Sequence, residues 1–461
     1  MSLKIKPKSS RGALAPVAAG TALVLVTYVT PMATLAPTSA DLGAGTVARA
    51  WILSAMSIGL AGALLAGGLL GDRAGRRRVY IGGLLAVVVG AVACAAAWDP
   101  WFLVGARILQ GAGGAAVLAC GLAILAHSYP PGPERLHSTA VWGASVGGGI
   151  AAGSLLAMAL DIGTGWRENY IAVACIGALL LVPTLRALPE SRSATPCRID
   201  LSGLVLLIVG MVLMVATLTQ GRDGVGAPTL VLGLLGFVAF AALWVVERRA
   251  RHPLVDPELL RHPNFRATTL GALTLGVGMI GMASFLPTVS QTGFGDSLRL
   301  ASVPPLVWAA TSMVAALSVR WLPFPLQGPL LIAALLALTA AGMLAAVSAD
   351  STLQLILPMA LTGVTTGFLN AILGREAVAS VPPDHAAMAS GANNTARYLG
   401  AACGITLFAV IAANNGTDIT DGWKNAVFTA SVITLFGAMA IAAQAIFRTR
   451  HNARGHGVAP V

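Results

Sequence analysis

The sequence predicts an all-α integral membrane protein, and three observations lead to this prediction. Only 10% of the 461 residues are charged and 56% are apolar, whereas a soluble domain carries about 25% charged residues. Apolar stretches of about twenty residues, the length that spans a hydrocarbon core of about 30 Å, recur along the whole chain. The basic residues gather in alternate short loops between these stretches, as they do in polytopic membrane proteins.

Hydropathy predicts fourteen membrane-spanning helices. Their lengths argue against a β-barrel, whose strands need only about ten residues of alternating polarity. The predicted spans are 13–36, 48–71, 79–97, 101–127, 138–161, 168–187, 201–220, 227–247, 265–289, 299–320, 328–348, 352–380, 387–413 and 425–447.

The distribution of Lys and Arg predicts that both termini lie in the cytoplasm. Of the 29 Lys and Arg residues, three lie within predicted spans, and most of the others lie on the side of the N-terminus. Positive charge is retained on the cytoplasmic side of the membrane, and an even number of spans returns the C-terminus to that side. The residues on the other side are Arg49, Arg167, Arg222, Arg299 and Lys424.

Composition argues against several classes of function. The net charge is +11, but the basic residues lie in short loops between the predicted spans. This placement is explained by membrane topology and gives no reason to expect a nucleic-acid partner. The chain contains no Walker-type loop for ATP and no cluster of a nucleophile with a base, so we expect no enzyme activity. Five scattered cysteines lack the spacing of a disulfide framework or a metal site, and we expect no metal and no cofactor. They are Cys94, Cys120, Cys175, Cys197 and Cys403.

A charged turn joins the second and third predicted spans and reads GLLGDRAGRRR from Gly68 to Arg78. Gly75 permits a tight reversal of the chain, and Asp72 can interact with the first N–H groups of a neighbouring helix. Arg73 and Arg76 can pair with acids or with lipid phosphates. Retention of positive charge alone would explain the arginines, but not the positions of Asp72 and Gly75.

The fourth span carries a second motif, ARILQG, which places Arg107, Gln110 and Gly111 inside an apolar segment. A guanidinium within a span is costly and needs a partner, so an intramembrane arginine is a functional hypothesis by default. A structural pair that holds this helix to the first or second span is an equally good interpretation.

These two motifs resemble the signatures of the major facilitator superfamily. Three further segments are similar to its fourteen-helix drug/proton antiporter branch: WRENYIAVACIGALLLVP at 166–183, HPLVDPELLRHPNFRATTLG at 252–271 and VPPDHAAMASGANNTARYLGAACG at 381–404. The resemblance covers nearly the whole chain. It implies the major facilitator fold, with twelve core helices in two pseudo-symmetric six-helix bundles and two extra central helices, in a monomer of the bacterial inner membrane.

The resemblance divides the chain into six parts. These are a cytoplasmic tail at 1–12, an N-terminal six-helix bundle at 13–190, two inserted helices at 200–247, a cytoplasmic linker at 248–264, a C-terminal six-helix bundle at 265–447 and a cytoplasmic tail at 448–461.

The resemblance also implies roles for motif residues. The loop residues Gly68, Asp72, Arg73, Gly75 and Arg76 would form a latch between the two bundles, and Arg107 would influence proton exchange or gating. A small-residue face is expected to pack against neighbouring helices. It comprises Gly111 in the fourth span and Gly147, Gly149 and Gly153 in the fifth. The antiporter signature of the family has a glycine followed by a proline at the position of Gly153 and Ser154. Ser154 replaces that proline, which weakens the antiporter inference.

The first span departs from the branch, whose members often carry an aspartate there. In those members a short stretch that ends in alanine-leucine-proline follows the aspartate. When that ending is matched to Leu35-Ala36-Pro37 of this chain, Tyr28 takes the position of the aspartate. Tyrosine, with a pKa of about 10, cannot exchange protons near neutral pH as an acid does. Glu376 is the best acid within a span, either as a proton carrier or as a gate that pairs with Arg397.

Polar and aromatic residues in the spans are expected to line a central substrate cavity. Such a pocket would suit an amphipathic or cationic organic compound. The candidates are Tyr28, Thr30, Gln110, Trp142, Ser145, Asn370, Asn393 and Asn394.

We therefore expect a secondary transporter that exports small organic compounds such as drugs, dyes or metabolites, driven by protons and surrounded by membrane lipids. One alternative is a facilitator without coupling, or a transporter coupled to another solute. Another is a membrane sensor or scaffold that transports nothing.

Overall fold

The computed structural model of the chain describes residues 12–129, 133–192, 200–221, 226–250, 259–321, 328–381, 386–414 and 419–455. Within these residues the regular elements are all helices. In chain order they are α1 (Leu14–Ala33), α2 (Leu35–Leu42), α3 (Thr46–Ala74), α4 (Arg76–Ala95), α5 (Pro100–Ser128), α6 (Pro133–Ala159), α7 (Arg167–Ala187), α8 (Leu201–Gln220), α9 (Ala227–Arg249), η2 (Leu259–Arg261), α10 (Pro263–Leu275), η3 (Gly276–Ile280), α11 (Gly281–Thr292), α12 (Leu298–Ala301), α13 (Val303–Ser318), η4 (Val319–Trp321), α14 (Pro329–Ala345), η5 (Thr352–Leu355), α15 (Ile356–Ala379), α16 (Ala386–Asn414) and α17 (Ile419–Gly455).

The described helices have the length and polarity of membrane spans. Thirteen helical segments among the described residues are long and apolar enough to cross a membrane, and α14 is apolar but shorter, at 17 residues. The prediction of an all-helical membrane protein is therefore confirmed. Helix α17 continues to Gly455, beyond the predicted end of the last span at 447. The predicted tails and linker lie partly outside the described residues, at 1–11, 251–258 and 456–461.

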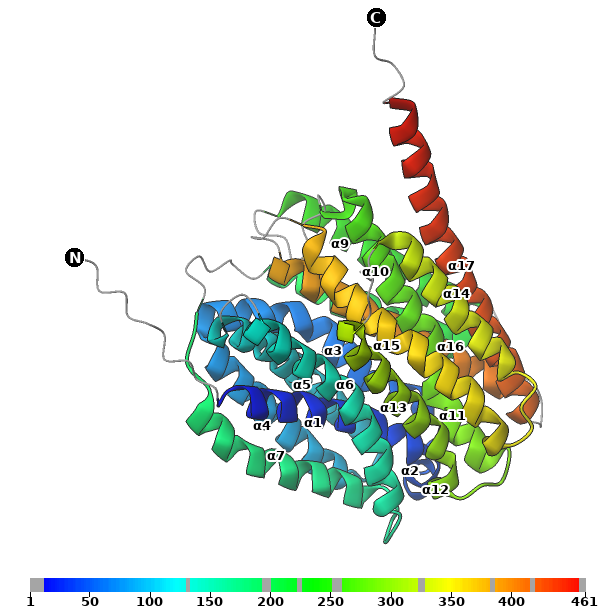
Figure 1. The fold of residues 1–461 in the computed structure, drawn as a ribbon. Helices are drawn as coiled ribbons and strands as arrows, with labels where there is room; N and C mark the ends of the chain where they lie inside the picture. The colour runs from blue at the N-terminus through cyan, green and yellow to red at the C-terminus, as the bar shows by residue number, and fades with distance from the viewer. Residues whose placement is uncertain are drawn as a thin grey trace, which may run out of the picture.

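The helices pack around two main buried apolar cores. The first core draws nearly all of its residues from α1 to α8, among them Leu60 and Tyr80. The second draws its residues almost entirely from α10 to α17, among them Leu336 and Phe408. We call these two groups of helices the first half and the second half. Figure 1 shows them side by side, with the blue and cyan helices α1 to α6 in one and the yellow to red helices α14 to α17 in the other.

The two halves meet through pairs of long helices. Helix α3 packs along α16, and α6 packs against α13. The hydroxyl oxygens of Ser54 in α3 and Thr406 in α16 lie 2.8 Å apart across this interface. Helices α8 and α9 pack on each other, and α8 also contacts both α3 and α16.

The two ends of the helix bundle are distinguished by their turns. We name the basic end after the turn between α3 and α4, where Arg73 and Arg76 lie. The other end of the bundle, where α2 turns into α3, is called the opposite end. At the basic end Gly75 adopts a φ of +114°, in a region that favours glycine over residues with a side chain. The sharp reversal between α3 and α4 therefore depends on Gly75.

Helix α1 is interrupted close to the interface between the halves. Pro31 lies inside α1 and has no N–H, so the carbonyl of Thr27 loses its usual donor one turn along the helix. Helix α1 ends at Ala33, and α2 begins two residues later.

The ninth span is interrupted by a π-helix. This turn, η3, joins α10 to α11 and packs against α16. A side chain at Gly276 would overlap the carbonyl oxygen of Arg397, so the glycine allows the two helices to touch. π-Helical turns occur frequently at functional sites, and this one lies beside the central cavity described below.

Candidate functional site

A central cavity of about 50 Å³ lies between the two halves. Helices α1 and α6 of the first half and α10, η3, α11, α13, α15 and α16 of the second half contribute to its wall. The lining residues are Leu25, Tyr28, Val29, Met32, Val146, Ile150, Leu275, Ile280, Ala283, Ser284, Pro305, Trp308, Thr366, Asn370, Arg397 and Tyr398. This volume holds a few water molecules at most, so an organic ligand requires the halves to move apart.

The wall is mainly apolar and aromatic, with few polar groups. Among the described lining residues, Arg397 is the one charged side chain. Its Nε is buried without a hydrogen-bond partner. Trp308 donates from Nε1 to the hydroxyl of Thr366 at 3.4 Å. Asn370 adds a side-chain amide from α15.

Tyr28 connects the two halves at the cavity. Its ring meets that of Tyr398 edge to face, with 6.0 Å between the ring centroids. Its hydroxyl lies 2.9 Å from the hydroxyl of Ser57 in α3. The position at which the family resemblance implies an aspartate thus lies in the cavity wall.

A larger groove of about 350 Å³ lies between α13 and α15. Its lining is almost wholly apolar, and Val314 in this lining is 62% exposed. Such a surface suits contact with lipid. We therefore assign the functional site to the smaller central cavity, where polar groups of both halves converge.

Of the eight residues predicted to line the cavity, Tyr28 and Asn370 lie in its wall. Two others lie between helices of the first half. The Thr30 hydroxyl donates to the carbonyls of Val26 and Gly153, and Gln110 is fully buried, where its Oε1 lies 3.6 Å from the sulfur of Cys94.

The remaining four predicted residues also lie outside the described cavity wall. Ser145 donates to the carbonyl of Trp142 in its own helix, and the Trp142 Nε1 is buried without a partner. Asn394 donates to the carbonyl of Ser390. Asn393 is fully buried, and neither atom of its side-chain amide has a partner.

Arg107 is fully buried inside the first half and has three acceptors. Its Nε donates to the carbonyl of Ile52 at 2.8 Å. Its Nη1 donates to the carbonyl of Thr27 at 3.4 Å and to the hydroxyl of Tyr170 at 3.5 Å. The side chain therefore ties α5 to α3, α1 and α7.

Glu376 lies on α15, and its side chain is 13% exposed. Its carboxylate lies 3.6 Å from the guanidinium of Arg375. The described ion pairs do not include one between Glu376 and Arg397. The structure thus joins the two neighbours in sequence and leaves Arg397 in the cavity wall.

The charged turn at the basic end is held by contacts within the first half. Arg76 donates from Nη2 and Nε to one carboxylate oxygen of Asp72, at 2.7 and 2.9 Å. Glu190, which follows α7, accepts from the backbone N–H of Arg77 at 3.2 Å and lies 3.6 Å from Arg78. Sequence reasoning did not identify Glu190 as a partner.

The other two loop positions make fewer contacts. Arg73 is exposed. A Cβ at Gly68 would meet only the side chain of Ala119, at 3.8 Å.

The predicted packing glycines lie at close helix contacts. A side chain at Gly111 would overlap the carbonyl oxygen of Met56 in α3. Gly149 and Gly153 lie against the backbone of α1, and Gly147 lies against Met313 of the second half. Helix α6 therefore contacts α1 within its own half and α13 across the interface.

The halves touch toward both ends of the cavity. Gln291 of α11 donates to the carbonyl of Ala33 at 2.8 Å. Nearer the basic end, Gly391 of α16 lies against the side chain of Leu65 in α3. The conformation is therefore closed around a small central volume.

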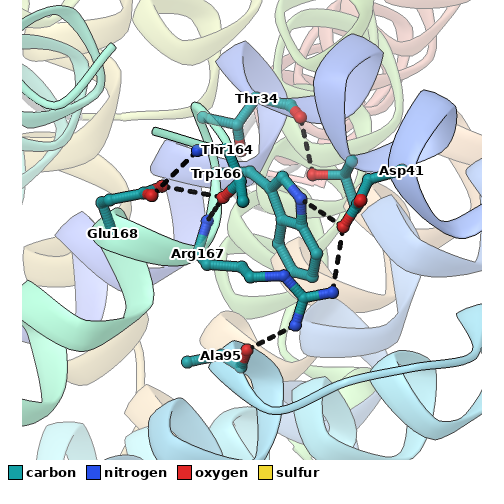
Figure 2. Close-up of polar contacts among 8 residues, drawn as sticks. Thr34, Asp41, Ala95, Thr164, Trp166, Arg167 and Glu168 are labelled. Atoms are coloured by element: carbon teal, nitrogen blue, oxygen red, sulfur yellow. Dashed lines mark hydrogen bonds and ion pairs between the residues drawn. The ribbon is translucent and has the colours of Figure 1, made fainter. Parts of the chain in front are cut away.

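A polar cluster ties three helices together at the opposite end of the first half (Figure 2). The carboxylate of Asp41 in α2 accepts from Arg167 at 2.9 Å and from the indole N–H of Trp166 at 3.1 Å. Arg167 also donates to the carbonyl of Ala95 at the end of α4, and its guanidinium lies 4.4 Å from the centroid of the Trp166 ring. The cluster fixes α2 against the start of α7.

Comparisons with known proteins agree with this architecture. The chain is 33% identical over 424 residues to the cephamycin export protein CmcT of Amycolatopsis lactamdurans, which covers 88% of this chain and 86% of that protein. It is also 33% identical over 383 residues to the puromycin resistance protein pur8 of Streptomyces alboniger, which covers 80% of this chain and 75% of that protein.

Among solved structures, the fold resembles that of a POT family transporter crystallised with 5-aminolevulinic acid. The TM-score is 0.68 over 96% of this chain and 97% of that chain, at 14% sequence identity, so this likeness concerns the fold alone. A sequence profile of the Major Facilitator Superfamily matches residues 17–405. With two helical halves around a central cavity and the charged turn after its second span, the chain belongs to the major facilitator superfamily of membrane transporters.

Proposed function

We propose that the chain exports small amphipathic organic compounds across the bacterial cytoplasmic membrane by alternating access. The observation that carries this proposal is the position of the cavity. Both halves contribute to its wall, so a change in their relative orientation would open it to one side or the other. Two relatives are named for cephamycin export and for puromycin resistance, which supports export as the direction.

The proposed topology has fourteen spans, with α14 as the eleventh. Two six-helix bundles at 13–190 and 265–447 would flank the inserted pair at 200–247, and both tails and the linker at 248–264 would be cytoplasmic. The Lys and Arg distribution supports this orientation. Apolar side chains on the outside, such as Leu179 and Phe237 at 73% and 71% exposure, suit a monomer surrounded by lipid.

The charged turn, with Gly68, Asp72, Arg73, Gly75 and Arg76, is proposed to act as a conformational latch between the two halves at the basic end. The Asp72–Arg76 pair and the contacts of Glu190 with Arg77 and Arg78 join α3, α4 and the segment after α7. These contacts lie within the first half, and α3 also packs along α16 of the second half, so movement of the halves would act on the pairs through α3.

Proton entry is the proposed driving force, with Glu376 as the candidate carrier. Its low exposure and its position on α15, which lines the cavity, support this role. Transport without coupling is the second candidate, and two observations favour it. Tyr28 occupies the expected position of the acid, and the described cavity wall contains no Asp or Glu.

A pair of engineered disulfides tests alternating access. Ser54→Cys with Thr406→Cys joins the two halves, whereas Thr339→Cys with Thr365→Cys joins α14 to α15 within the second half. The hydroxyl oxygens lie 2.8 Å apart in both pairs, so each pair of sulfurs can come within bonding reach after a small adjustment. Both pairs are built in a variant without the five native cysteines.

Inside-out membrane vesicles report export as uptake of cephamycin or puromycin. Oxidation should stop uptake by the Ser54/Thr406 pair, a reductant should restore it, and the Thr339/Thr365 pair should transport in both states. Unchanged uptake by the oxidised Ser54/Thr406 pair would contradict alternating access. Binding of either compound by the unmodified chain without any uptake would favour a sensor or scaffold.

Proteoliposomes that contain a pH-sensitive dye test the coupling. Proton movement on addition of a transported compound, lost in Glu376→Gln and kept in the exposed control Glu134→Gln, would support Glu376 as the carrier. Transport of the compound without proton movement would instead support the uncoupled facilitator.

A further inference from the structure

We propose that the central cavity binds an organic anion, with its charged group held by Arg397 and its apolar body held by the aromatic wall. This inference rests on the proposed role of the cavity as the substrate site. It narrows the substrate class from amphipathic compounds in general to those that carry a carboxylate or a similar anionic group.

The first step of the argument is the charge of the cavity. Arg397 is the one charged group among the described lining residues, and no carboxylate accompanies it. A guanidinium stays protonated at physiological pH. A cationic ligand would therefore meet a like charge in a poorly hydrated space, whereas an anionic ligand would meet an opposite charge.

The second step is a comparison of two arginines of the spans, Arg107, which is fully buried, and Arg397, which is partly buried. Arg107 donates to three oxygen atoms of its own half. Arg397 makes no described hydrogen bond or ion pair, and its Nε is buried without a partner. A buried N–H without an acceptor is costly, so the Arg397 guanidinium, whose Nε has no acceptor in the protein, is available to a ligand.

The third step concerns how Arg397 is positioned. Its carbonyl lies against Gly276 in the π-helical turn η3, where a side chain would overlap it. This close contact fixes the backbone of α16 at the point where the guanidinium enters the wall. A charged group presented by a rigid helix contact suits recognition, because little ordering is needed on binding.

The rest of the wall suits an apolar body with one polar end. The rings of Tyr28, Trp308 and Tyr398 supply aromatic surface, and Asn370 supplies an additional amide donor. Aromatic rings alone could attract a cation, but here they share the cavity with Arg397. The combination therefore favours an anion.

Binding of two matched probes to the purified full-length chain tests the proposal. The probes are 2-naphthoate and its uncharged isostere 2-naphthamide, with affinity read from the shift of the thermal unfolding midpoint against probe concentration. We expect naphthoate to bind at least about tenfold more tightly, as one charged hydrogen-bonded pair permits. Arg397→Gln should abolish this preference, and Arg397→Lys should retain part of it.

Arg375→Gln is the matched control, because it removes the same charge from α15 at a half-exposed position outside the described cavity wall. It should keep the preference for naphthoate. Equal stabilisation by the two probes, stabilisation by neither, or a preference that survives in Arg397→Gln would each overturn the proposal. A naphthoate preference in a chain that fails to transport in vesicles would leave the anion site standing and would refute only the export function.

Discussion

The guanidinium of Arg107 donates to the carbonyl oxygen of Thr27 at 3.4 Å, the oxygen that Pro31 leaves without its helical donor. The same guanidinium donates to the carbonyl of Ile52 at 2.8 Å. A charge buried in a span thus donates to the carbonyl that Pro31 leaves without a helical donor. The proline and the arginine are 76 positions apart in the sequence, yet they form one structural unit.

This unit predicts an energetic coupling between Pro31 and Arg107. Arg107→Gln should lower the free energy of unfolding by about 1.5–3 kcal/mol, as expected for lost charged hydrogen bonds. In a Pro31→Ala background the cost should fall by about 1 kcal/mol, because the new N–H can bond to the Thr27 carbonyl. Unfolding of the four variants in detergent measures the coupling.

Pro287→Ala in α11 provides the control for this cycle, since Pro287 also lies inside a helix but in the second half. It should leave the cost of Arg107→Gln unchanged. If Arg107→Gln costs the same in the unmodified chain, in Pro31→Ala and in Pro287→Ala, the contact with the Thr27 carbonyl contributes nothing to the free energy of unfolding.

The close contact of α3 and α5 yields a second prediction. Gly111→Ala should destabilise the protein by about 1–3 kcal/mol, because a Cβ there would overlap the carbonyl oxygen of Met56. Gly105→Ala on the same helix should be neutral or slightly stabilising, since no atom lies within 4 Å of its Cβ position. The thermal unfolding midpoints of the two variants test this prediction, and similar midpoints would contradict the packing argument.

The spans could be predicted from the sequence because apolar length is written directly in it. Helix α8 occupies residues 201–220, the predicted range, and α5 begins one residue before its prediction, where the Asp99 side chain accepts from two backbone N–H groups of the first turn. The breaks at η3 and after Ala33 were not predicted. They depend on contacts with other helices, which hydropathy does not contain.

The cavity wall was harder to predict, for a physical reason. A polar residue in a span shows that a partner is needed, but the partner can be a ligand or a neighbouring helix. Thr30 bonds to a neighbouring helix, whereas Asn370 lines the cavity. Apolar residues such as Val146 and Ile150 also line it, and nothing in their local sequence separates them from residues that face lipid.

The hydroxyl pair of Tyr28 and Ser57 gives a third prediction. Each of Tyr28→Phe and Ser57→Ala should cost about 1 kcal/mol of unfolding free energy, because each removes one half of a buried hydrogen bond. The double variant should cost little more than the larger single cost. Additive costs in the unfolding measurements would mean that the 2.9 Å contact contributes nothing.

The ion pair of Asp41 and Arg167 in Figure 2 gives a fourth prediction, concerning salt. Asp41→Asn removes the charge of a carboxylate 2.9 Å from Arg167 and only half exposed, so it should cost up to about 1 kcal/mol at low ionic strength. At 1 M salt, where the Debye length is about 3 Å, most of that cost should disappear.

The pair of Lys424 and Asp350 serves as the comparison, because it has the same 2.9 Å separation but its aspartate is 74% exposed. Asp350→Asn should change the unfolding midpoint less than Asp41→Asn at every salt concentration, since solvent already screens that carboxylate. Unfolding at low and at 1 M salt measures both variants. A cost of Asp41→Asn that does not depend on salt would mean that the cluster is held by the Trp166 hydrogen bond and by packing, and that the charge of Asp41 contributes little to fixing α2.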